Sequence, residues 1–277
     1  MKPINDKNAK ILYNQIIAPG YCRTGIKSPV IAKRAKPGQF LEVSCSNGYD
    51  PLLRRPLSVH RVILSKGIVE LLYCIIGKGT RILSGIKPGE KLDIIGPLGN
   101  TFTINPKIKK AVLIGGGMGV APLLFWAEKL KELNKRCSNS QKKKIYVVIG
   151  AANKKTVLCE REFRACTPEV GVVTEDGSQG LKGLAPDMLR SFLDALGVEQ
   201  TGVYACGPKP MLKAISSLVA KVDLLKCELS MEEYMGCGLG VCHGCAIKVR
   251  DGEGKPVYKM VCSDGPIFQA RDIIWQY

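Results

Sequence analysis

Four cysteines toward the end of the chain are spaced closely enough to act as one set of ligands. They follow the pattern Cys237-x4-Cys242-x2-Cys245-x16-Cys262, and the first three lie in the stretch MGCGLGVCHGCAIKV. A loop that wraps around a metal centre needs positive φ angles, close backbone approach and amide N–H groups aimed at sulfur. Glycines at this density meet the first two needs: they are Gly236, Gly238, Gly240 and Gly244.

The spacing separates two kinds of metal centre. Structural zinc sites usually combine two Cys-x2-Cys pairs or include histidines, whereas this segment has one such pair and the chain has only His60 and His243. The C-x4-C-x2-C…C pattern instead holds a [2Fe–2S] cluster. We therefore predict that the four cysteines bind a [2Fe–2S] cluster, with zinc as the alternative, and that His243 faces solvent and is not a ligand.

A glycine-rich turn, GGGMGVAP from Gly115 to Pro122, forms a second candidate site. It follows a strand-like apolar run and opens a helix, which is where the pyrophosphate of a dinucleotide binds. It departs from G-x-G-x-x-G, so ordinary turn chemistry stays open, but ACGP and TEDGS follow later strands, where they would line the same crevice. The predicted nucleotide-binding residues are Gly115, Gly116, Gly117, Gly119, Pro122, Asp176, Cys206, Gly207 and Pro208.

The stretch RRPLS, from Arg54 to Ser58, carries a third candidate site. The guanidinium of Arg55 can fork onto a phosphate, and the Ser58 hydroxyl can bind a ring nitrogen or carbonyl. Strand alternation predicts Arg55 and Leu57 on one face and Ser58 on the other, unless the backbone bends. The stretch GKGT, opening a short helix at Gly77–Thr80, is a second candidate phosphate cradle. Each stretch alone is also consistent with an ordinary surface strand or turn.

Two kinds of periodicity predict the elements that position these residues. Between Ile11 and Phe102, short β-branched or alternating runs are separated by glycine turns, which favours an antiparallel barrel or sandwich. From about Lys107 to Leu225, buried strand runs alternate with amphipathic helices, which predicts a doubly wound parallel sheet. From Cys227 onward the periodicity fades, and the clustered cysteines must stabilise a small module that has too few apolar residues for a core of its own. We predict domains at 1–106, 107–225 and 226–277.

The overall composition identifies no partner by itself. The net charge is +17, but the basic residues are scattered apart from a run at Gln141–Lys144, so we expect no nucleic acid partner. A solvated surface or attraction of anionic cofactors or an acidic protein explains this charge. The chain shows no secretory signal pattern and no apolar run of membrane length, which predicts a cytoplasmic protein without a membrane span.

The cysteines outside the four-residue set stand alone in unrelated surroundings. A reducing compartment argues against a disulfide framework, so we predict that they are small buried hydrophobes. They are Cys22, Cys45, Cys74, Cys137, Cys159, Cys166, Cys206 and Cys227.

Taken in order, these segments resemble the ferredoxin–NADP reductase superfamily, and within it the family of electron-transfer subunits of NAD-dependent dihydroorotate dehydrogenases of type 1B. The resemblance runs from about Ile11 to Trp275. In the superfamily an R-x-[aromatic]-[ST] strand binds FAD; the match here is Arg55-Pro56-Leu57-Ser58, with an aliphatic Leu57 that suits the dihydroorotate group. The same resemblance assigns to the FAD site the residues Leu72, Tyr73, Cys74, Gly79 and Thr80.

The other motifs extend the resemblance. The turn at Gly115–Pro122 looks like the GG-x-G-x-x-P turn under the nicotinamide dinucleotide, and Cys206-Gly207-Pro208 looks like the CGP segment near the nicotinamide. The stretch VCSDGPIF, which contains Cys262, is the most specific match. The small subunit of NADH-dependent ferredoxin–NADP transhydrogenase is also similar, but its first cluster ligand is typically Asp where this chain has Cys237.

The resemblance implies a redox adaptor with FAD, a [2Fe–2S] cluster and NAD as substrate, and with no catalytic residue for dihydroorotate of its own. Electrons from a catalytic FMN-containing dihydroorotate dehydrogenase subunit would pass through the cluster and FAD to NAD+ in pyrimidine (UMP) biosynthesis. The expected assembly is a heterotetramer of two plus two subunits. Two alternatives stay open: a subunit of another flavin and iron–sulfur NAD(P)H oxidoreductase, such as a transhydrogenase or sulfide-linked reductase, and a non-enzymatic zinc-stabilised binding module.

Overall fold

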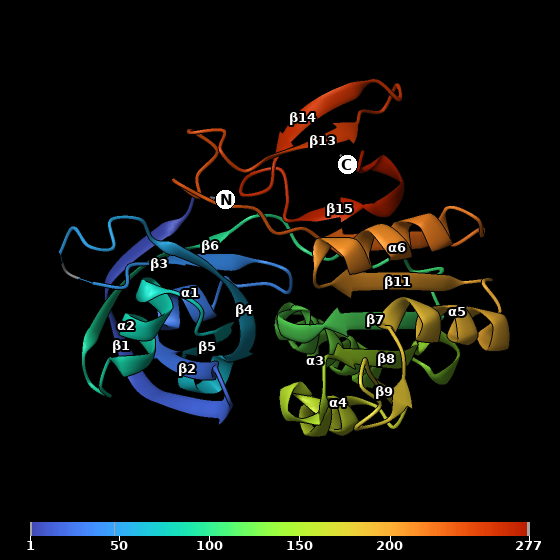
Figure 1. Cartoon of the computed structure of the whole chain (residues 1–277), viewed down its shortest axis with the longest axis horizontal. Helices are drawn as coiled ribbons and strands as arrows, with labels where there is room; N and C mark the ends of the chain where they lie inside the picture. The colour runs from blue at the N-terminus through green and yellow to red at the C-terminus, as the bar shows by residue number, and fades with distance from the viewer. Residues whose placement is uncertain (1, 47, 276–277) are drawn as a thin grey trace.

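The short N-terminal strands close into an antiparallel barrel in the computed structural model, which describes residues 2–46 and 48–275 (Figure 1). Around the barrel the strand order is β1-β2-β5-β4-β3-β6, and its core includes Ile11, Leu41 and Leu71. The prediction of an antiparallel barrel is confirmed. The elements are β1 (Ile4–Ala18), β2 (Tyr21–Lys27), α1 (Pro29–Ala32), β3 (Phe40–Val43), β4 (Arg55–Ile63), β5 (Ile68–Cys74), α2 (Lys78–Gly85) and β6 (Lys91–Leu98).

The second region is a mainly parallel sheet in the order β10-β9-β8-β7-β11-β12-β15. Its central strands β7, β8 and β11 are almost continuously buried, as expected when helices cover both faces. The prediction of a doubly wound sheet is confirmed. The elements are β7 (Lys110–Gly116), α3 (Val120–Arg136), β8 (Lys144–Ala151), α4 (Glu160–Cys166), β9 (Val170–Thr174), β10 (Leu181–Lys182), α5 (Ala185–Leu196), β11 (Thr201–Cys206), α6 (Lys209–Val219) and β12 (Lys226–Ser230).

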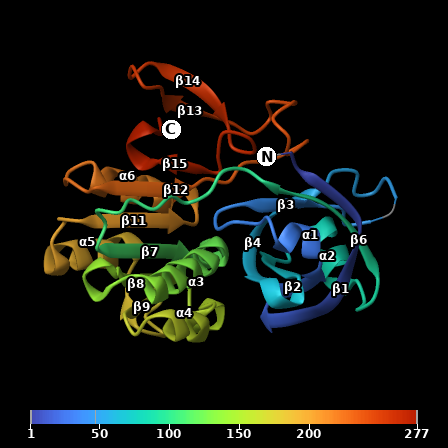
Figure 2. The same cartoon turned by 180° about the vertical axis from the view of Figure 1, so that it is seen from behind.

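Residue alternation along β7 shows how the two faces are covered. Val112 and Ile114 pack with the apolar side chains of α5 and α6, whereas Ala111 and Leu113 pack with those of α3 and α4. The strands point their carboxyl ends toward the barrel (Figures 1 and 2). The loops that were predicted to bind a nucleotide therefore face the barrel.

The C-terminal segment contributes to the sheet as well as to a separate hairpin. β12 pairs in parallel with β11, and β15 (Ile267–Gln269) pairs antiparallel with β12. A separate hairpin joins β13 (Ala246–Arg250) to β14 (Pro256–Met260). Two strands of the sheet thus come from the segment 226–277 that the sequence assigned to the cluster module. Short strands, of five residues or fewer, gave too little periodicity to be recognised.

Asn100, just beyond the barrel, ties the barrel to the segment that follows Cys262. Its side-chain amide donates to the carbonyls of Asp264 and Ile267 at 2.8 Å each, and its Oδ1 accepts from the Ile267 amide at 2.8 Å. The Asn100 backbone amide also donates to the Gly265 carbonyl at 2.6 Å. This junction holds the cluster segment against the end of the barrel.

Short 3-10 helices complete the described elements: η1 (Leu64–Lys66), η2 (Gly117–Gly119), η3 (Asn139–Gln141), η4 (Lys154–Thr156) and η5 (Ala270–Asp272). Among the described residues, no helix has the length and apolar character needed to cross a membrane. Of the scattered cysteines, Cys22, Cys45, Cys159, Cys206 and Cys227 are buried as predicted, whereas Cys74, Cys137 and Cys166 are half-buried.

Candidate functional site

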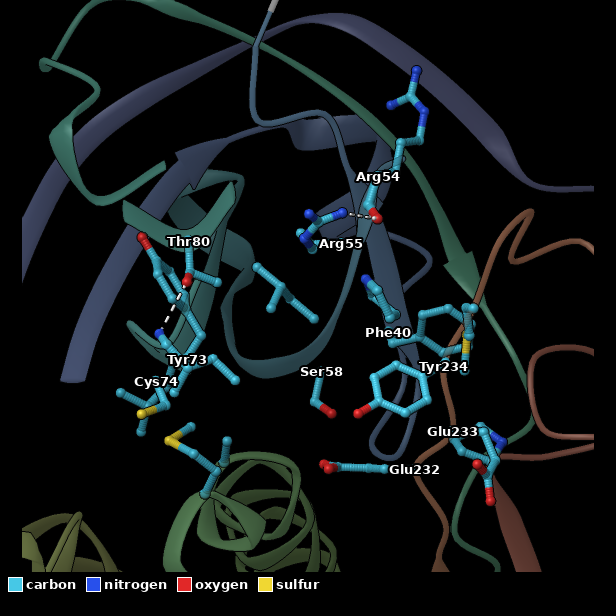
Figure 3. A pocket seen from close by; sticks show the side chains of 18 of the residues that line it. Phe40, Arg54, Arg55, Ser58, Tyr73, Cys74, Thr80, Glu232, Glu233 and Tyr234 are labelled. Atoms are coloured by element: carbon cyan, nitrogen blue, oxygen red, sulfur yellow. Dashed lines mark hydrogen bonds between the residues drawn. The ribbon is translucent and has the colours of Figure 1, made fainter. Parts of the chain in front are cut away.

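A cavity of about 680 Å³ lies where the barrel, the start of α3 and the segment after β12 meet (Figure 3). The barrel wall comes from β3, β4, β5 and the start of α2. The lining residues are Phe40, Leu53, Arg54, Arg55, Pro56, Leu57, Ser58, Leu72, Tyr73, Cys74, Ile76, Gly77, Thr80, Met118, Ala121, Ser230, Met231, Glu232, Glu233, Tyr234, Met235 and Pro266.

The predicted strand Arg55–Ser58 lines this cavity along its whole length. The expected split of Arg55 and Leu57 from Ser58 agrees with the strand register. Arg55 and Leu57 lie opposite the barrel-core residues Val43 and Leu41, and Leu57 packs against that core, whereas Ser58 lies opposite Phe40, which packs outside it. The strand Arg55–Ser58 pairs with β3 on one side only, and the pairing of β4 with β5 begins at Val59, so the strand edge itself opens onto the cavity. Because no neighbouring strand covers that edge, all four residues from Arg55 to Ser58 line the cavity.

Arg55 lies against the first turn of α2. Its guanidinium donates to the Leu53 carbonyl at 2.7 Å, and a Cβ added at Gly79 would be only 2.8 Å from its Nε. Thr80 closes this turn, since its hydroxyl accepts from the amides of Ile76 and Gly77 at 3.1 and 3.2 Å. The structure thus brings the RRPLS and GKGT motifs together, with a guanidinium beside a helix N-terminus, an arrangement suited to phosphate.

Tyr73 is among the residues that line the cavity, but its side chain is buried in the barrel core. The hydroxyl lies 3.1 Å from the Thr24 Oγ1, and burial, together with a hydrogen bond to Cys22, raises the pKa of Tyr73 above its usual value. Leu72 and Cys74 line the same wall, and burial raises the pKa of the Cys74 thiol. These side chains offer an apolar surface suited to a flat ring system.

Sequence reasoning missed the segment from Ser230 to Met235, which forms the opposite wall. The Glu232 side chain is open to the cavity, yet desolvation by the surrounding walls raises the pKa of its carboxyl group. Figure 3 places Ser58, Glu232 and Tyr234 around the same part of the cavity. The acidic stretch MEEYM, directly after the end of a sheet strand, was the signal that could have indicated it.

The glycine turn and the CGP segment pack directly against each other. Gly115 on β7 pairs with Cys206 on β11, and a Cβ added at Gly119 would lie 1.9 Å from the Cys206 carbonyl oxygen. Only glycine allows this approach. A Cβ added at Gly207 would lie 3.1 Å from the Gly116 Cα, Gly117 takes a φ of 53°, and Pro122 is buried in the first turn of α3. Pro208 precedes α6. The glycine turn and the CGP segment thus lie together at the carboxyl ends of two neighbouring strands.

Asp176 lies at the same sheet edge but away from the cavity. It is exposed in the turn after β9, which β8 separates from β7. The Ser178 hydroxyl and amide donate to its carboxylate at 2.6 and 2.9 Å and lower its pKa. The structure does not bring Asp176 together with the residues that line the cavity.

The four predicted ligands lie in two pairs. The Sγ atoms of Cys245 and Cys262 are 3.3 Å apart, and both residues are buried. Burial and the neighbouring Cys245 raise the pKa of the Cys262 thiol to about 12. Cys237 and Cys242, which are more exposed, form the other pair, joined by a side-chain hydrogen bond. Among residues 2–46 and 48–275, no three His, Cys, Asp or Glu side chains converge on a single metal position.

Backbone amides point at these sulfur atoms, as the glycine-rich sequence predicts. The amides of Leu239 and Cys242 donate to the Cys237 Sγ at 3.3 and 3.4 Å, and the Gly240 amide donates to the Cys262 Sγ at 3.2 Å. Burial disfavours the Cys237 thiolate, but the amides of Cys242, Leu239 and Val241 outweigh it and lower its pKa to about 6. The loop therefore stabilises negative sulfur, which a cationic metal centre requires.

Positive φ angles occur at only two of the four loop glycines, Gly238 at 68° and Gly240 at 81°. His243 takes the third left-handed position with a φ of 58°, and it is exposed, as predicted. Gly238 is wedged against the barrel, because a Cβ there would lie 2.4 Å from the Glu42 Oε1. Glu42 is buried on β3, and neither of its carboxylate oxygens has a partner among the described residues.

Comparison with known proteins identifies the family. Residues 232–274 match the iron-sulfur cluster binding domain of dihydroorotate dehydrogenase B, and residues 113–217 match the oxidoreductase NAD-binding domain. The dihydroorotate dehydrogenase B (NAD(+)) electron transfer subunit of Desulforamulus reducens is 39% identical over 97% of this chain and 98% of the relative. The chain belongs to this family of electron transfer subunits. The subunit of the same name from Geobacillus kaustophilus is 37% identical over 98% of this chain and 99% of its own.

Solved structures agree on the fold. The NADH-dependent reduced ferredoxin-NADP oxidoreductase, a structure that addresses flavin-based electron bifurcation, superposes with a TM-score of 0.82 at 29% identity, covering 98% of this chain and 90% of the other. A ferredoxin NADP+ reductase from Neisseria gonorrhoeae has a TM-score of 0.64 at 19% identity, covering 80% of this chain and 92% of the other, which supports the fold alone.

The chain is thus the electron transfer component of an NAD-linked dihydroorotate dehydrogenase B, with iron–sulfur and NAD-binding domains on a ferredoxin reductase-like fold. The resemblance inferred from the sequence is confirmed. The match to an iron–sulfur domain contradicts the alternative of a zinc-stabilised binding module.

Proposed function

We propose that this chain holds one [2Fe–2S] cluster on Cys237, Cys242, Cys245 and Cys262, FAD in the 680 Å³ cavity, and NAD at the glycine turn. It passes electrons from a catalytic FMN-containing dihydroorotate dehydrogenase subunit to NAD+. The net reaction of the complex is dihydroorotate + NAD+ → orotate + NADH + H+. The chain's own task is to bind and orient the cofactors.

The pairing of the thiols supports a two-iron cluster. Two thiolates on one tetrahedral metal lie roughly 3.8 Å apart for metal–sulfur bonds of about 2.3 Å. The 3.3 Å between the Cys245 and Cys262 sulfurs is close to this value, and Cys237 and Cys242 form a second pair. Two metal positions with two thiolates each match a [2Fe–2S] cluster.

The cavity fits FAD in size and chemistry. Its volume lies within the range of about 300–1,000 Å³ typical of ligand sites. Arg55 and the start of α2 offer charge and amides to the phosphates, while Ser58, Leu72 and Cys74 line the space for the flavin ring. FAD, when bound, converts electrons carried singly by a cluster into a hydride for NAD+.

One observation carries the proposal: a single cavity is lined by the Arg55–Ser58 strand, by the helix that follows the glycine turn, and by the segment that leads into the cluster loop. Ser58 comes from the FAD strand, Ala121 from the helix that opens with the nucleotide turn, and Met235 from the chain just before Cys237. These side chains therefore hold the nicotinamide side, the flavin and the cluster loop next to one another.

The catalytic partner supplies dihydroorotate chemistry, and we propose a heterotetramer of two plus two subunits. A permanent interface of this kind would bury more than the roughly 1,200–2,000 Å² of a standard complex. The cluster loop offers exposed apolar side chains to this interface: Leu239 is 45% exposed and Val241 is 77% exposed. We further propose a cytoplasmic location, which the unpaired state of the cysteines supports.

Reconstitution tests this function. The isolated chain should oxidise NADH with artificial acceptors and leave dihydroorotate untouched, while adding the cognate FMN subunit should produce NAD+-dependent orotate formation. Orotate is measured for the pair and for each subunit alone. Turnover of dihydroorotate by the isolated chain, or a folded pair that never couples it to NAD+, would contradict the proposal.

The likeness to the ferredoxin-NADP oxidoreductase favours a second candidate, a transhydrogenase-like subunit. The same preparation distinguishes the two. NADP+ reduction that requires ferredoxin, without orotate formation, would support the second candidate. Iron and acid-labile sulfide in equal amounts, two of each per chain, are expected in either case for a [2Fe–2S] cluster.

A further inference from the structure

Two residues just beyond Ser58 connect the flavin strand to helix α3. His60 is fully buried, and its Nδ1 lies 3.0 Å from the carbonyl oxygen of Ala121. A carbonyl can only accept, so the Nδ1 carries the proton and donates. Desolvation lowers the pKa of His60 to about 4, which keeps the ring neutral and this tautomer fixed near neutral pH.

The next residue, Arg61, makes a second connection to the same helix. Its Nε donates to the Glu128 Oε1 at 2.8 Å, and its Nη2 is 2.6 Å from the same oxygen. Its Nη1 lies 3.8 Å from the nearly buried Glu70 on β5, whose other oxygen accepts from the Tyr13 hydroxyl. The guanidinium is therefore held from the barrel side and in turn holds α3.

Helix α3 presents a dedicated face to the barrel. Ala121, Phe125 and Glu128 are spaced i, i+4 and i+7, so they share one side of the helix. Phe125 packs against the barrel core, whereas Val120, Leu124 and Ala127 of the same helix pack on the sheet. The helix that opens with the nucleotide turn is thus clamped between its own sheet and the flavin barrel.

We propose that His60 and Arg61 are positioning residues that fix the glycine turn of α3 relative to the flavin strand, and so set the approach of the nicotinamide to the flavin ring. This inference rests on the proposed function. Neither residue lines the cavity, so neither touches either ring directly.

The contacts of His60 and Arg61 with helix α3 lie close to the place where the nicotinamide would meet the flavin. Ala121 lines the cavity and lies in the first turn of α3, while His60 follows Ser58 by two residues on one strand. A displacement of about 1 Å between reacting groups can lower a rate about 100-fold. The Arg23–Glu162 ion pair, at 3.2 Å between β2 and α4, also joins the two domains but touches neither the cavity nor α3.

Paired variants of His60 test the proposal in the FAD-loaded chain. His60→Leu removes the donor, while His60→Asn keeps an N–H near the position of Nδ1. We expect His60→Leu to slow the reduction of bound FAD by NADH about 10- to 100-fold in stopped-flow measurements. The rate of FAD reduction in His60→Asn should stay within about threefold of the wild-type rate. In this step a hydride leaves NADH, which becomes NAD+, and FAD accepts it together with a proton from solvent.

Three further readouts separate positioning from general damage. FAD content, the melting temperature and the NAD+ dissociation constant from calorimetry should stay near wild type in His60→Leu. The long-wavelength charge-transfer absorbance of NADH stacked on FAD should weaken in His60→Leu and return in His60→Asn. Glu128→Gln should slow FAD reduction by about two- to fivefold, as expected for a partly exposed ion pair. Lys129→Gln, on the same helix but paired with Glu132, serves as the control.

The outcomes distinguish a failure of the proposed function from a failure of the positioning role of His60 and Arg61. If NADH does not reduce FAD in the wild-type chain, the proposed function fails. If it does, and His60→Leu matches wild type, or His60→Asn loses as much as His60→Leu, the positioning role is overturned. Should His60→Leu fail to fold, Glu128→Gln carries the test: unchanged rate and absorbance would overturn the role of Arg61, and with it the proposal.

Discussion

The cavity that we propose for FAD and the loop that we propose for the cluster are built in opposite ways. The cavity gathers side chains from segments that lie far apart in the chain, between Phe40 and Pro266. The cluster loop takes three of its four sulfurs from nine consecutive residues and presents them with its own backbone amides. The cavity therefore depends on how domains pack, whereas the loop depends mainly on local conformation.

The largest expected effect concerns the local site. Cys242→Ser removes one of four thiolates, and we expect loss or strong alteration of the cluster. The C-terminal segment should then be cleaved faster by proteases, because the cluster no longer stabilises it. FAD should remain bound. Iron content, visible absorbance and flavin content measure this, with Cys137→Ser as a control outside the loop. Simultaneous loss of FAD would show that the two sites are not independent.

Gly119→Ala tests the tightest packing between loops of the sheet. The new Cβ would lie 1.9 Å from the Cys206 carbonyl oxygen, so the turn must move. We expect a loss of about 3 kcal/mol in the free energy of unfolding and weaker NAD+ binding. Denaturant unfolding and calorimetry measure these. Gly117→Asn, in open space at a φ of 53° that Asn tolerates, should change the unfolding free energy by less than about 1 kcal/mol. Equal effects would refute the packing argument.

Arg55→Ala probes the charged end of the cavity. Removing a charged hydrogen-bond donor should weaken FAD binding by about 1.5–3 kcal/mol, or roughly 10- to 100-fold. The dissociation constant can be measured from flavin fluorescence during titration of the FAD-free chain. Arg81→Ala, exposed on the same helix that Arg55 contacts, is the control. FAD bound as tightly as by wild type would mean that the phosphates lie elsewhere.

Glu42, where the barrel meets the cluster loop, gives the smallest expected effect and a dependence on pH. Desolvation raises its pKa from 4.5 to about 7, opposed by Arg54 and reinforced by Cys237. The folded chain binds the Glu42 proton more tightly than the unfolded chain does. The stability that this proton adds to the folded chain is therefore fully present below pH 4.5 and is lost as the pH rises to 7.

Glu42→Gln should therefore raise the unfolding free energy at pH 8 by about 1–2 kcal/mol and flatten its decline between pH 5 and 8. Denaturant unfolding at several pH values measures this. Glu90→Gln, on the exposed surface, should leave the profile unchanged. A wild-type profile that does not fall over this range would show that Glu42 gains a partner in the loaded protein.

The same contrast explains what the sequence could reveal. Cysteine spacing predicted the cluster ligands, and the strand-turn-helix pattern predicted the nucleotide turn at Gly115–Pro122, because both signals are local. The wall from Ser230 to Met235 was missed because its role depends on β12 joining the sheet beside β11, a long-range pairing. The sequence also could not show that all of Arg55–Ser58 would line one cavity, because this depends on β5 leaving that part of β4 unpaired.

The junction at Asn100 bears on the order in which the protein matures. During synthesis the barrel and the first strands of the sheet leave the ribosome well before the residues at 264–267 that Asn100 binds. Until β15 arrives, the free edge of β12 and the barrel end around Asn100 have no cover. Cys262 lies two residues before the segment that Asn100 binds. We therefore expect cluster loading to favour closure of this sheet edge, so that the chain from iron-starved cells is more open to proteases there.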